Sequence, residues 1–171
     1  MVAVVQPVAA GIDAVWRILG SIPDPEIPVI SICDLGIVRE VSVDAAEVRI
    51  VITPTYSGCP AMHAIEEDIR SRLVEAGYAT VAISTTLTPA WTTDWMNESA
   101  KERLREYGIA PPTQTLAPTI VRFVTHRHAA PACPLCGSHD TELLSQFGST
   151  ACKALYRCVE CREPFDYFKP I

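Results

Sequence analysis

Apolar residues recur every three or four positions in two segments of the first half of the chain. The first segment, residues 11–19, has this helical spacing, and Pro23 stops it. The second runs from Pro60 to about Ala76, and Gly77 after it is typical of the residue that follows a helix. The pattern therefore predicts two amphipathic helices.

Three other segments are rich in Val, Ile and Thr, which favour strands: residues 36–43, 47–53 and 80–87. Only Asp44 and two alanines separate the first two, so we expect a β-hairpin there. Three prolines in the preceding stretch, SIPDPEIPVI, predict a rigid extended loop. The order α-β-β-α-β predicts an α+β fold, a small α/β sandwich with helices on one face of a three-stranded sheet.

The remaining sequence predicts a second, smaller domain. A further helix is expected over 97–107, with Asn97 or Ser99 as its cap and Gly108 at its end. The proline-rich stretch that follows is typical of a linker. We therefore expect domains at 1–108 and 131–171, joined by a linker over 109–130.

Two Cys-x-x-Cys pairs lie in the second domain, about twenty residues apart. Each pair can fold into a tight turn that presents two thiolates to one ion, and two such turns complete a tetrahedron. The unit is small, so metal binding would supply much of its folding free energy. The spacing predicts a four-cysteine ribbon with these metal ligands: Cys133, Cys136, Cys158 and Cys161.

Zinc is the default metal for four thiolates, and iron is the alternative. The first turn, CPLCG, resembles the iron-binding turn of rubredoxins, but Arg162 follows the second turn where those proteins have glycine. Cys152 and His139 lie in the same unit. Either could replace a ligand or lie beside the ligands, and a plain buried cysteine and a surface histidine are the alternatives.

Cys59 immediately precedes Pro60 at the start of the second predicted helix. Because proline favours the first helical position, we expect Cys59 at the N-cap, where unpaired N–H groups and the helix dipole stabilise a thiolate. Cys59 is thus a candidate reactive thiol or iron ligand, with an ordinary cap as the alternative. Carboxylates in the neighbouring loops, including Asp34, are candidate ligands or plain turn formers.

Composition limits the classes of function. With 49% hydrophobic and 20% charged residues, the chain is typical of a globular protein. No apolar stretch is long enough to span a membrane, and the N-terminus lacks the basic region of a signal peptide. Clustered cysteines without a signal peptide indicate a reducing cytoplasm. The net charge of −6 disfavours nucleic-acid binding.

The motifs resemble a known family. Over roughly residues 10–108, the chain resembles the MIP-type domain of SufT-like proteins and cytosolic iron–sulfur targeting factors, on the strings DPEIPVISICDLGIVREV and VITPTYSGCPA. The C-terminal string FGSTACKALYRCVECREPFDYFKPI resembles one branch of that family, PaaD (PaaJ) of bacterial phenylacetyl-CoA epoxidase systems. The resemblance covers nearly the whole chain.

This resemblance implies a role in aerobic phenylacetate breakdown. The chain lacks a Glu-x-x-His pair and a nicotinamide or flavin fingerprint, so it is neither the di-iron oxygenase nor its reductase. The resemblance implies instead a non-catalytic factor that matures or loads an iron–sulfur or iron centre. A transient iron species would bind at Cys59 with Asp34 as companion, and the ribbon would dock another component of the epoxidase, the iron–sulfur reductase first among them. A homodimer is left open.

Two other functions remain as alternatives. The ribbon could hold iron and transfer electrons as rubredoxins do. It could also bind nucleic acid, because residues 122–128 are locally basic although the whole chain is acidic.

Overall fold

A computed structural model describes residues 11–44, 47–113 and 130–171. The chain forms two compact units, which divide between Trp91 and Thr92. Each unit has its own sheet. Among the described residues no helix combines the length and the apolar character that crossing a bilayer needs.

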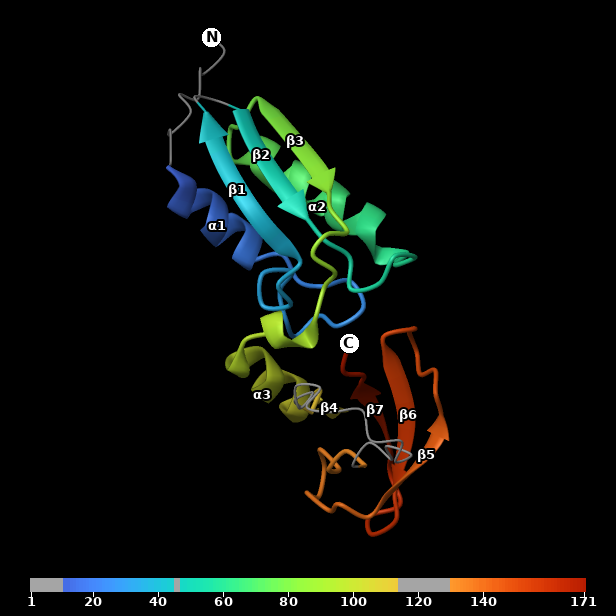
Figure 1. The fold of residues 1–171 in the computed structure, drawn as a ribbon. Coiled ribbons are helices and arrows are strands. Elements are labelled where there is room, and N and C mark those ends of the chain that lie inside the picture. Colours follow the sequence, from blue (N-terminus) through green and yellow to red (C-terminus); the bar gives the residue numbers. More distant parts are fainter. Residues whose placement is uncertain (1–10, 45–46, 114–129) are drawn as a thin grey trace. The chain divides into compact units, whose positions relative to one another are not determined.

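The sheet of the first unit has three strands in the order β1-β2-β3 (Figure 1). Strands β1 (Val38–Asp44) and β2 (Glu47–Ile52) pair antiparallel as the expected hairpin. The two alanines of the expected turn lie outside the described residues. Strand β3 (Thr80–Thr85) pairs parallel with β2, which requires a crossover connection, and the second helix makes it.

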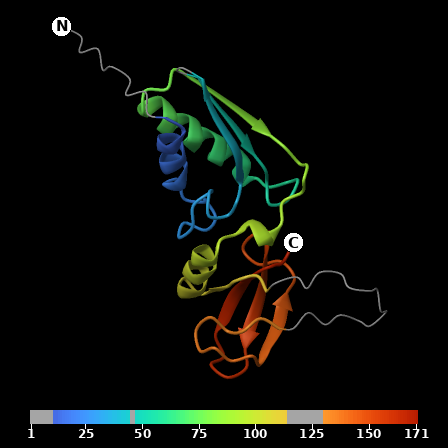
Figure 2. The same cartoon turned by 60° about the vertical axis from the view of Figure 1, so that its left-hand side comes forward.

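Helices α1 (Ile12–Gly20) and α2 (Ala61–Glu75) lie on the same face of this sheet, as Figure 2 shows. The apolar stripe predicted for each helix faces the core, where Val15, Leu19, Ile65 and Ile69 are almost completely buried. Gly77, at φ 94°, ends α2 in the conformation that glycine favours. The α-β-β-α-β fold predicted from the periodicity is confirmed.

Three connecting loops gather at one end of this sheet. The register pairs Val38 at the start of β1 with Ile52 at the end of β2, and Ile52 with Thr85 at the end of β3. The loops before β1, after β2 and after β3 therefore leave from the same end, as Figure 1 shows. The Trp91 indole N–H donates to the Leu35 carbonyl over 2.9 Å, which joins the last of these loops to the first.

The second unit begins with two short helices, η1 (Thr93–Trp95) and α3 (Glu98–Glu106). Its sheet has the strand order β4-β7-β6-β5. Its strands are β4 (Ile109–Ala110), β5 (Thr141–Ser145), β6 (Lys153–Cys158) and β7 (Pro164–Phe168). Strands β5, β6 and β7 form an antiparallel ribbon, and β4 pairs parallel with β7.

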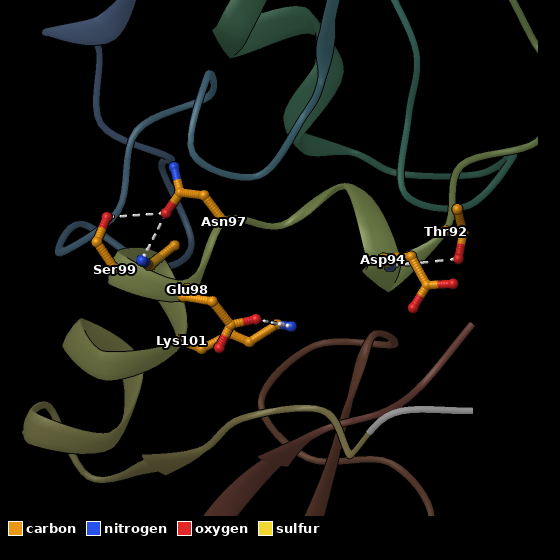
Figure 3. Close-up of polar contacts among 7 residues, drawn as sticks. Thr92, Asp94, Asn97, Glu98, Ser99 and Lys101 are labelled. Carbon is orange, nitrogen blue, oxygen red and sulfur yellow. Dashed lines mark hydrogen bonds and ion pairs between the residues drawn. The ribbon is translucent and has the colours of Figure 1, made fainter. Parts of the chain in front are cut away.

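The start of α3 has the cap that the sequence predicts. The Asn97 side chain accepts hydrogen bonds from the Ala100 N–H at 2.7 Å and from the Ser99 hydroxyl at 2.9 Å (Figure 3). Asn97 is therefore the cap and Ser99 supports it, because one amide oxygen satisfies two donors. Gly108 follows the helix at φ 92°.

The compact units differ from the expected domains in the placement of α3. The expected first domain ran to residue 108, whereas α3 belongs to the second unit. The physical reason is the pairing of β4, because Ile109 and Ala110 lie in the expected linker yet are buried against β7. Most of the expected linker, residues 114–129, lies outside the described residues.

Candidate functional site

The four cysteines of the two Cys-x-x-Cys pairs converge in the second unit. Cys133 and Cys136 lie in a turn before β5, Cys158 ends β6, and Cys161 lies in the turn between β6 and β7. The sulfurs of Cys136 and Cys158 are 3.5 Å apart, and those of Cys133 and Cys161 are 3.7 Å apart. All four sulfurs lie within 4.8 Å of one another. Each close pair joins one turn to the other.

This spacing fits one tetrahedral ion. Four sulfurs placed about 2.3 Å from a central zinc would lie about 3.8 Å from one another. The two shortest separations, 3.5 and 3.7 Å, are close to that value. The four thiols thus form a metal-binding cluster of the zinc-ribbon type, in which Cys133, Cys136, Cys158 and Cys161 would hold the ion.

The same backbone hydrogen bond closes each turn: the Cys133 N–H donates to the Ser138 carbonyl at 2.8 Å, and the Cys158 N–H donates to the Glu163 carbonyl at 3.0 Å. In the first, the Cys133 carbonyl accepts from the Gly137 N–H at 2.9 Å. In the second, the Cys158 sulfur accepts from the Cys161 N–H at 3.5 Å. This N–H donor is the main cause that lowers the pKa of Cys158 to about 7. The Cys161 N–H therefore stabilises the thiolate form of Cys158, which is the form that a metal ligand needs.

Burial divides the cluster between core and surface. Cys133 and Cys158 are buried in the core of the second unit with Phe165 and Tyr167, whereas Cys136 is exposed. Four thiolates leave no open coordination position for water or substrate, which is typical of a structural site. The arrangement can tie two turns together, and it offers no site for hydrolysis.

Of the two alternatives for Cys152, a place beside the ligands and a plain buried cysteine, the structure gives the first no support. Cys152 immediately precedes β6, whereas Cys158 ends that strand. Six residues of extended chain separate the two by about 20 Å. The Cys152 sulfur lies instead 3.0 Å from the Thr150 hydroxyl oxygen. The buried-residue alternative thus describes Cys152 better.

His139 follows the first turn, and its side chain is exposed. Its neighbours hold the turn, because the Ser138 carbonyl accepts from the Cys133 N–H at 2.8 Å and the Asp140 carbonyl accepts from the Val159 N–H at 2.9 Å. Its role near the metal stays a prediction.

Cys59 lies one position further from α2 than the sequence predicts. The helix begins at Ala61 and its N-cap is Pro60, so Cys59 precedes the cap. The Cys59 carbonyl accepts from the Met62 N–H at 3.4 Å, and its side chain is half-buried. Pro60 already has helical angles, φ −70° and ψ −20°, as proline does at the start of a helix, so the observed boundary differs from the predicted one by a single residue.

Asp34 lies in the loop before β1, where it fixes a turn. One of its carboxylate oxygens accepts from the Ser31 N–H at 2.9 Å and from the Ser31 hydroxyl at 2.7 Å. Since this loop and the loop that carries Cys59 leave from the same end of the sheet, the structure brings both candidates to that end. The turn-forming alternative is supported for Asp34, and a second role for it stays a prediction.

Cys33, next to Asp34, is a thiol that our reading of the sequence did not single out. Burial, with a contribution from the Asp34 carboxylate, raises its pKa to about 12. The Cys33 thiol is therefore neutral near pH 7. Its position inside an apolar string carries no pattern from which this could have been predicted.

In the part of the first unit that the structure describes, this end of the sheet carries no group of three or more candidate metal ligands. Among the described residues, the four-cysteine cluster is the one group of three or more candidate ligands close enough to hold an ion. An iron species at Cys59 would therefore have few protein ligands.

Two family models match the chain, and they divide it much as the motifs do. A model described as "Iron-sulfur cluster assembly protein" matches residues 12–85, and one described as "PaaD zinc beta ribbon domain" matches residues 118–169. The first covers the three-stranded sheet with its two helices, and the second contains all four clustered cysteines.

Individual proteins agree with these matches. The chain is 51% identical over 162 residues to a protein of Escherichia coli K12 that is named as a putative component of 1,2-phenylacetyl-CoA epoxidase, covering 94% of this chain and 93% of the relative. It is 40% identical over 90 residues, 52% of this chain and 85% of the relative, to an "Fe-S protein maturation auxiliary factor" of Porphyromonas gingivalis.

Among solved structures, a domain of unknown function from Bacillus anthracis matches with a TM-score of 0.50 and 27% identity, over 54% of this chain and 89% of that one. The resemblance found in the sequence motifs is thereby confirmed. Because the likeness to the Escherichia coli relative extends over almost its full length and includes the cysteine ribbon, the chain belongs to the PaaD family.

Proposed function

We propose that this chain is an accessory component of a phenylacetyl-CoA epoxidase that matures or loads an iron–sulfur or iron centre in another subunit. The observation that carries the proposal is the union, in one chain, of an iron–sulfur assembly domain at 12–85 with the ribbon of an epoxidase subunit family. The protein is non-catalytic in this proposal, because a closed four-thiolate site offers no open position for chemistry.

The two units have different roles in this proposal. The iron or iron–sulfur cargo binds transiently at Cys59, with Asp34 as a companion at the same end of the sheet. The ribbon holds zinc, which ties its two turns together without redox chemistry. The partner is another subunit of the epoxidase, in the first place its iron–sulfur reductase. Light scattering of the purified protein tests whether it also forms a homodimer.

The experiment compares Cys59→Ser with a matched cysteine control in the same unit. The epoxidase reductase is produced together with each variant, and its iron and acid-labile sulfide are measured per chain. We expect Cys59→Ser to lower the iron content of the reductase severalfold, whereas Cys33→Ala leaves it unchanged because the Cys33 thiol is neutral. Full occupancy of the reductase with Cys59→Ser would refute the role of this cysteine.

Visible absorption distinguishes the proposed function from electron transfer by iron in the ribbon. Zinc bound to four thiolates has no visible absorption, whereas iron in the same site is coloured. We expect protein purified in air to be colourless and to contain one zinc per chain. A stoichiometric, reducible iron in the four-cysteine cluster would favour the electron-transfer function instead.

A further inference from the structure

Several hydrogen bonds and an ion pair hold the loop between β5 and β6. The Gly148 N–H donates to the Lys153 carbonyl at 2.8 Å, and the Lys153 N–H donates to the Thr150 carbonyl at 3.1 Å. Beneath the loop, the Lys153 ammonium lies 3.6 Å from an oxygen of Asp166, which also accepts from the Ser149 hydroxyl at 3.0 Å. The loop is therefore fixed from both sides.

Gly148 packs so closely against this ion pair that no side chain fits. A Cβ at this position would lie 2.6 Å from an Asp166 carboxylate oxygen and 3.3 Å from the Lys153 Cβ. The Lys153 side chain itself is 5% exposed. Ordering a loop costs conformational entropy, and these contacts offset that cost. Such a construction indicates that the position of the loop matters.

The loop and the edge strand beside it present three apolar side chains to solvent. Phe147 is 66% exposed, Leu144 49% and Leu143 47%. Strand β5 is the edge of the second sheet (Figure 1), and its register shifts between Leu143 and Ser145. Leu144 is thus the extra residue of a bulge, which discourages another strand from pairing with this edge. The exposed side chains, and not the backbone edge, are what a partner can contact.

A hollow of about 240 Å³ lies beside these residues. Its floor is formed by four residues whose register places them on the same face of the sheet: Leu143, Ala154, Tyr156 and Tyr167. Three further residues, Gln146, Lys169 and Pro170, line it together with Phe147. The Lys169 ammonium donates to the Gln146 carbonyl at 3.1 Å and lies 4.7 Å from the centre of the Phe147 ring. The hollow is therefore largely apolar, with one cation at its edge.

The size of this surface decides what class of ligand it fits. Small-molecule sites usually have volumes of about 300–1,000 Å³ and bury most of the ligand. This hollow is smaller, and two residues of its wall, Leu143 and Phe147, are 47% and 66% exposed. The three exposed side chains offer on the order of 300 Å² of apolar area, well short of the roughly 800 Å² per partner of a stable interface. The small volume of the hollow and the small exposed apolar area both fit one side chain of a transiently bound protein.

The charge of the surface decides the chemistry of that partner. Of the described residues that line the hollow, Lys169 alone carries a charge, and it is positive in a chain of net charge −6. An ammonium has three donors, and one of them bonds to Gln146, so others can reach a carboxylate. We propose that Leu143, Phe147 and Lys169 form a docking surface for a partner segment that presents an apolar anchor side chain next to a carboxylate. The identity of the partner, a subunit of the epoxidase, rests on the proposed function.

The experiment measures the dissociation constant between each purified epoxidase subunit and the full chain by titration calorimetry. The variants are Phe147→Ser, Lys169→Glu and Lys169→Gln, and the matched control is Val74→Ser, an exposed apolar residue of α2 in the first unit. All the substituted side chains are at least partly exposed, so the fold is preserved, and metal content and the midpoint of thermal unfolding check this.

We expect Phe147→Ser and Lys169→Glu each to raise the dissociation constant at least about 10-fold, as central anchor residues do, and Val74→Ser to leave it unchanged. We also expect the wild-type constant to rise with salt, and this dependence to weaken in Lys169→Gln. Binding by Phe147→Ser and Lys169→Glu within about threefold of wild type would overturn the docking surface alone. Failure of the wild-type chain to bind any subunit would overturn the proposed function and this surface together.

Discussion

Gly137 and Arg162 have the same left-handed backbone conformation, each directly after the second cysteine of its turn. The φ angle is 77° at Gly137 and 65° at Arg162. The two turns of the metal cluster are thus built alike, although their sequences differ at this position. Glycine adopts this conformation freely, whereas arginine pays a steric cost of roughly 1–2 kcal/mol there.

Arg162→Gly is therefore expected to stabilise the second unit. Relief of the strain is opposed by the added flexibility of the unfolded chain, about 0.4–1 kcal/mol, so the net gain should be about 0.5–1 kcal/mol. The free energy of unfolding of the metal-loaded protein, from denaturant titration, measures it. The converse variant, Gly137→Ala, is the control.

A Cβ at Gly137 would contact nothing within 4 Å, so only the backbone conformation is at stake in that control. We expect Gly137→Ala to destabilise by about 1 kcal/mol. A loss of stability in Arg162→Gly would show instead that the arginine side chain makes contacts that outweigh its backbone strain.

Much of the fold could be predicted because its signals are local. The apolar stripes of α1 and α2, the Asn97 cap and the terminal glycines all act within a turn of the chain, and each is found where the sequence indicates. The four cysteines also converge as predicted, because two Cys-x-x-Cys turns can satisfy a tetrahedron in few ways.

Features that depend on contacts distant in sequence could not be predicted. The residues around Ile109 and Ala110 carry no sequence signal for their pairing with β7. That pairing assigns α3 to the second unit. The length of β6, which carries Cys152 far from the cluster, depends on its pairing with β7 across the ribbon.

Removing either residue of the buried ion pair under the β5–β6 loop should lower the free energy of unfolding, but by different amounts. The Lys153 side chain is 5% exposed and that of Asp166 is 23% exposed. Asp166→Asn leaves an ammonium buried without its carboxylate, and we expect a loss of about 2 kcal/mol in the free energy of unfolding. Lys153→Met leaves a partly hydrated carboxylate that still accepts from Ser149, so the loss should be about 1 kcal/mol. Equal losses would contradict this asymmetry.

The Cys33 thiol should make the stability of the first unit depend on alkaline pH. Its pKa rises from an ordinary value of 9.0 to about 12 in the folded protein, mainly through burial. Between these values the unfolded chain loses the thiol proton while the folded chain keeps it, so stability is complete below about pH 9 and falls as the pH rises toward 12. Denaturant unfolding at pH 8 and pH 10 measures the difference.

Cys33→Ala is the control for this pH dependence. Other groups titrate in the same range, so the test is the difference between wild type and variant and not the wild-type curve alone. We expect Cys33→Ala to lose less stability between pH 8 and pH 10 than wild type does. Identical losses in the two proteins would mean that the thiol ionises at the same pH in the folded and unfolded chains.

Removal of the metal should unfold the ribbon, and two cysteine variants separate the ligands from their neighbour. We expect Cys136→Ser to lose most of its bound metal, because the Cys136 sulfur lies 3.5 Å from that of Cys158 and one of four ligands is weakened. Cys152→Ser should keep one ion per chain, since Cys152 lies at the opposite end of β6. Elemental analysis after gel filtration measures both. Metal loss in Cys152→Ser with the sheet intact would show that Cys152 contributes to metal binding after all. Metal retention in Cys136→Ser would show that Cys136 is not a metal ligand.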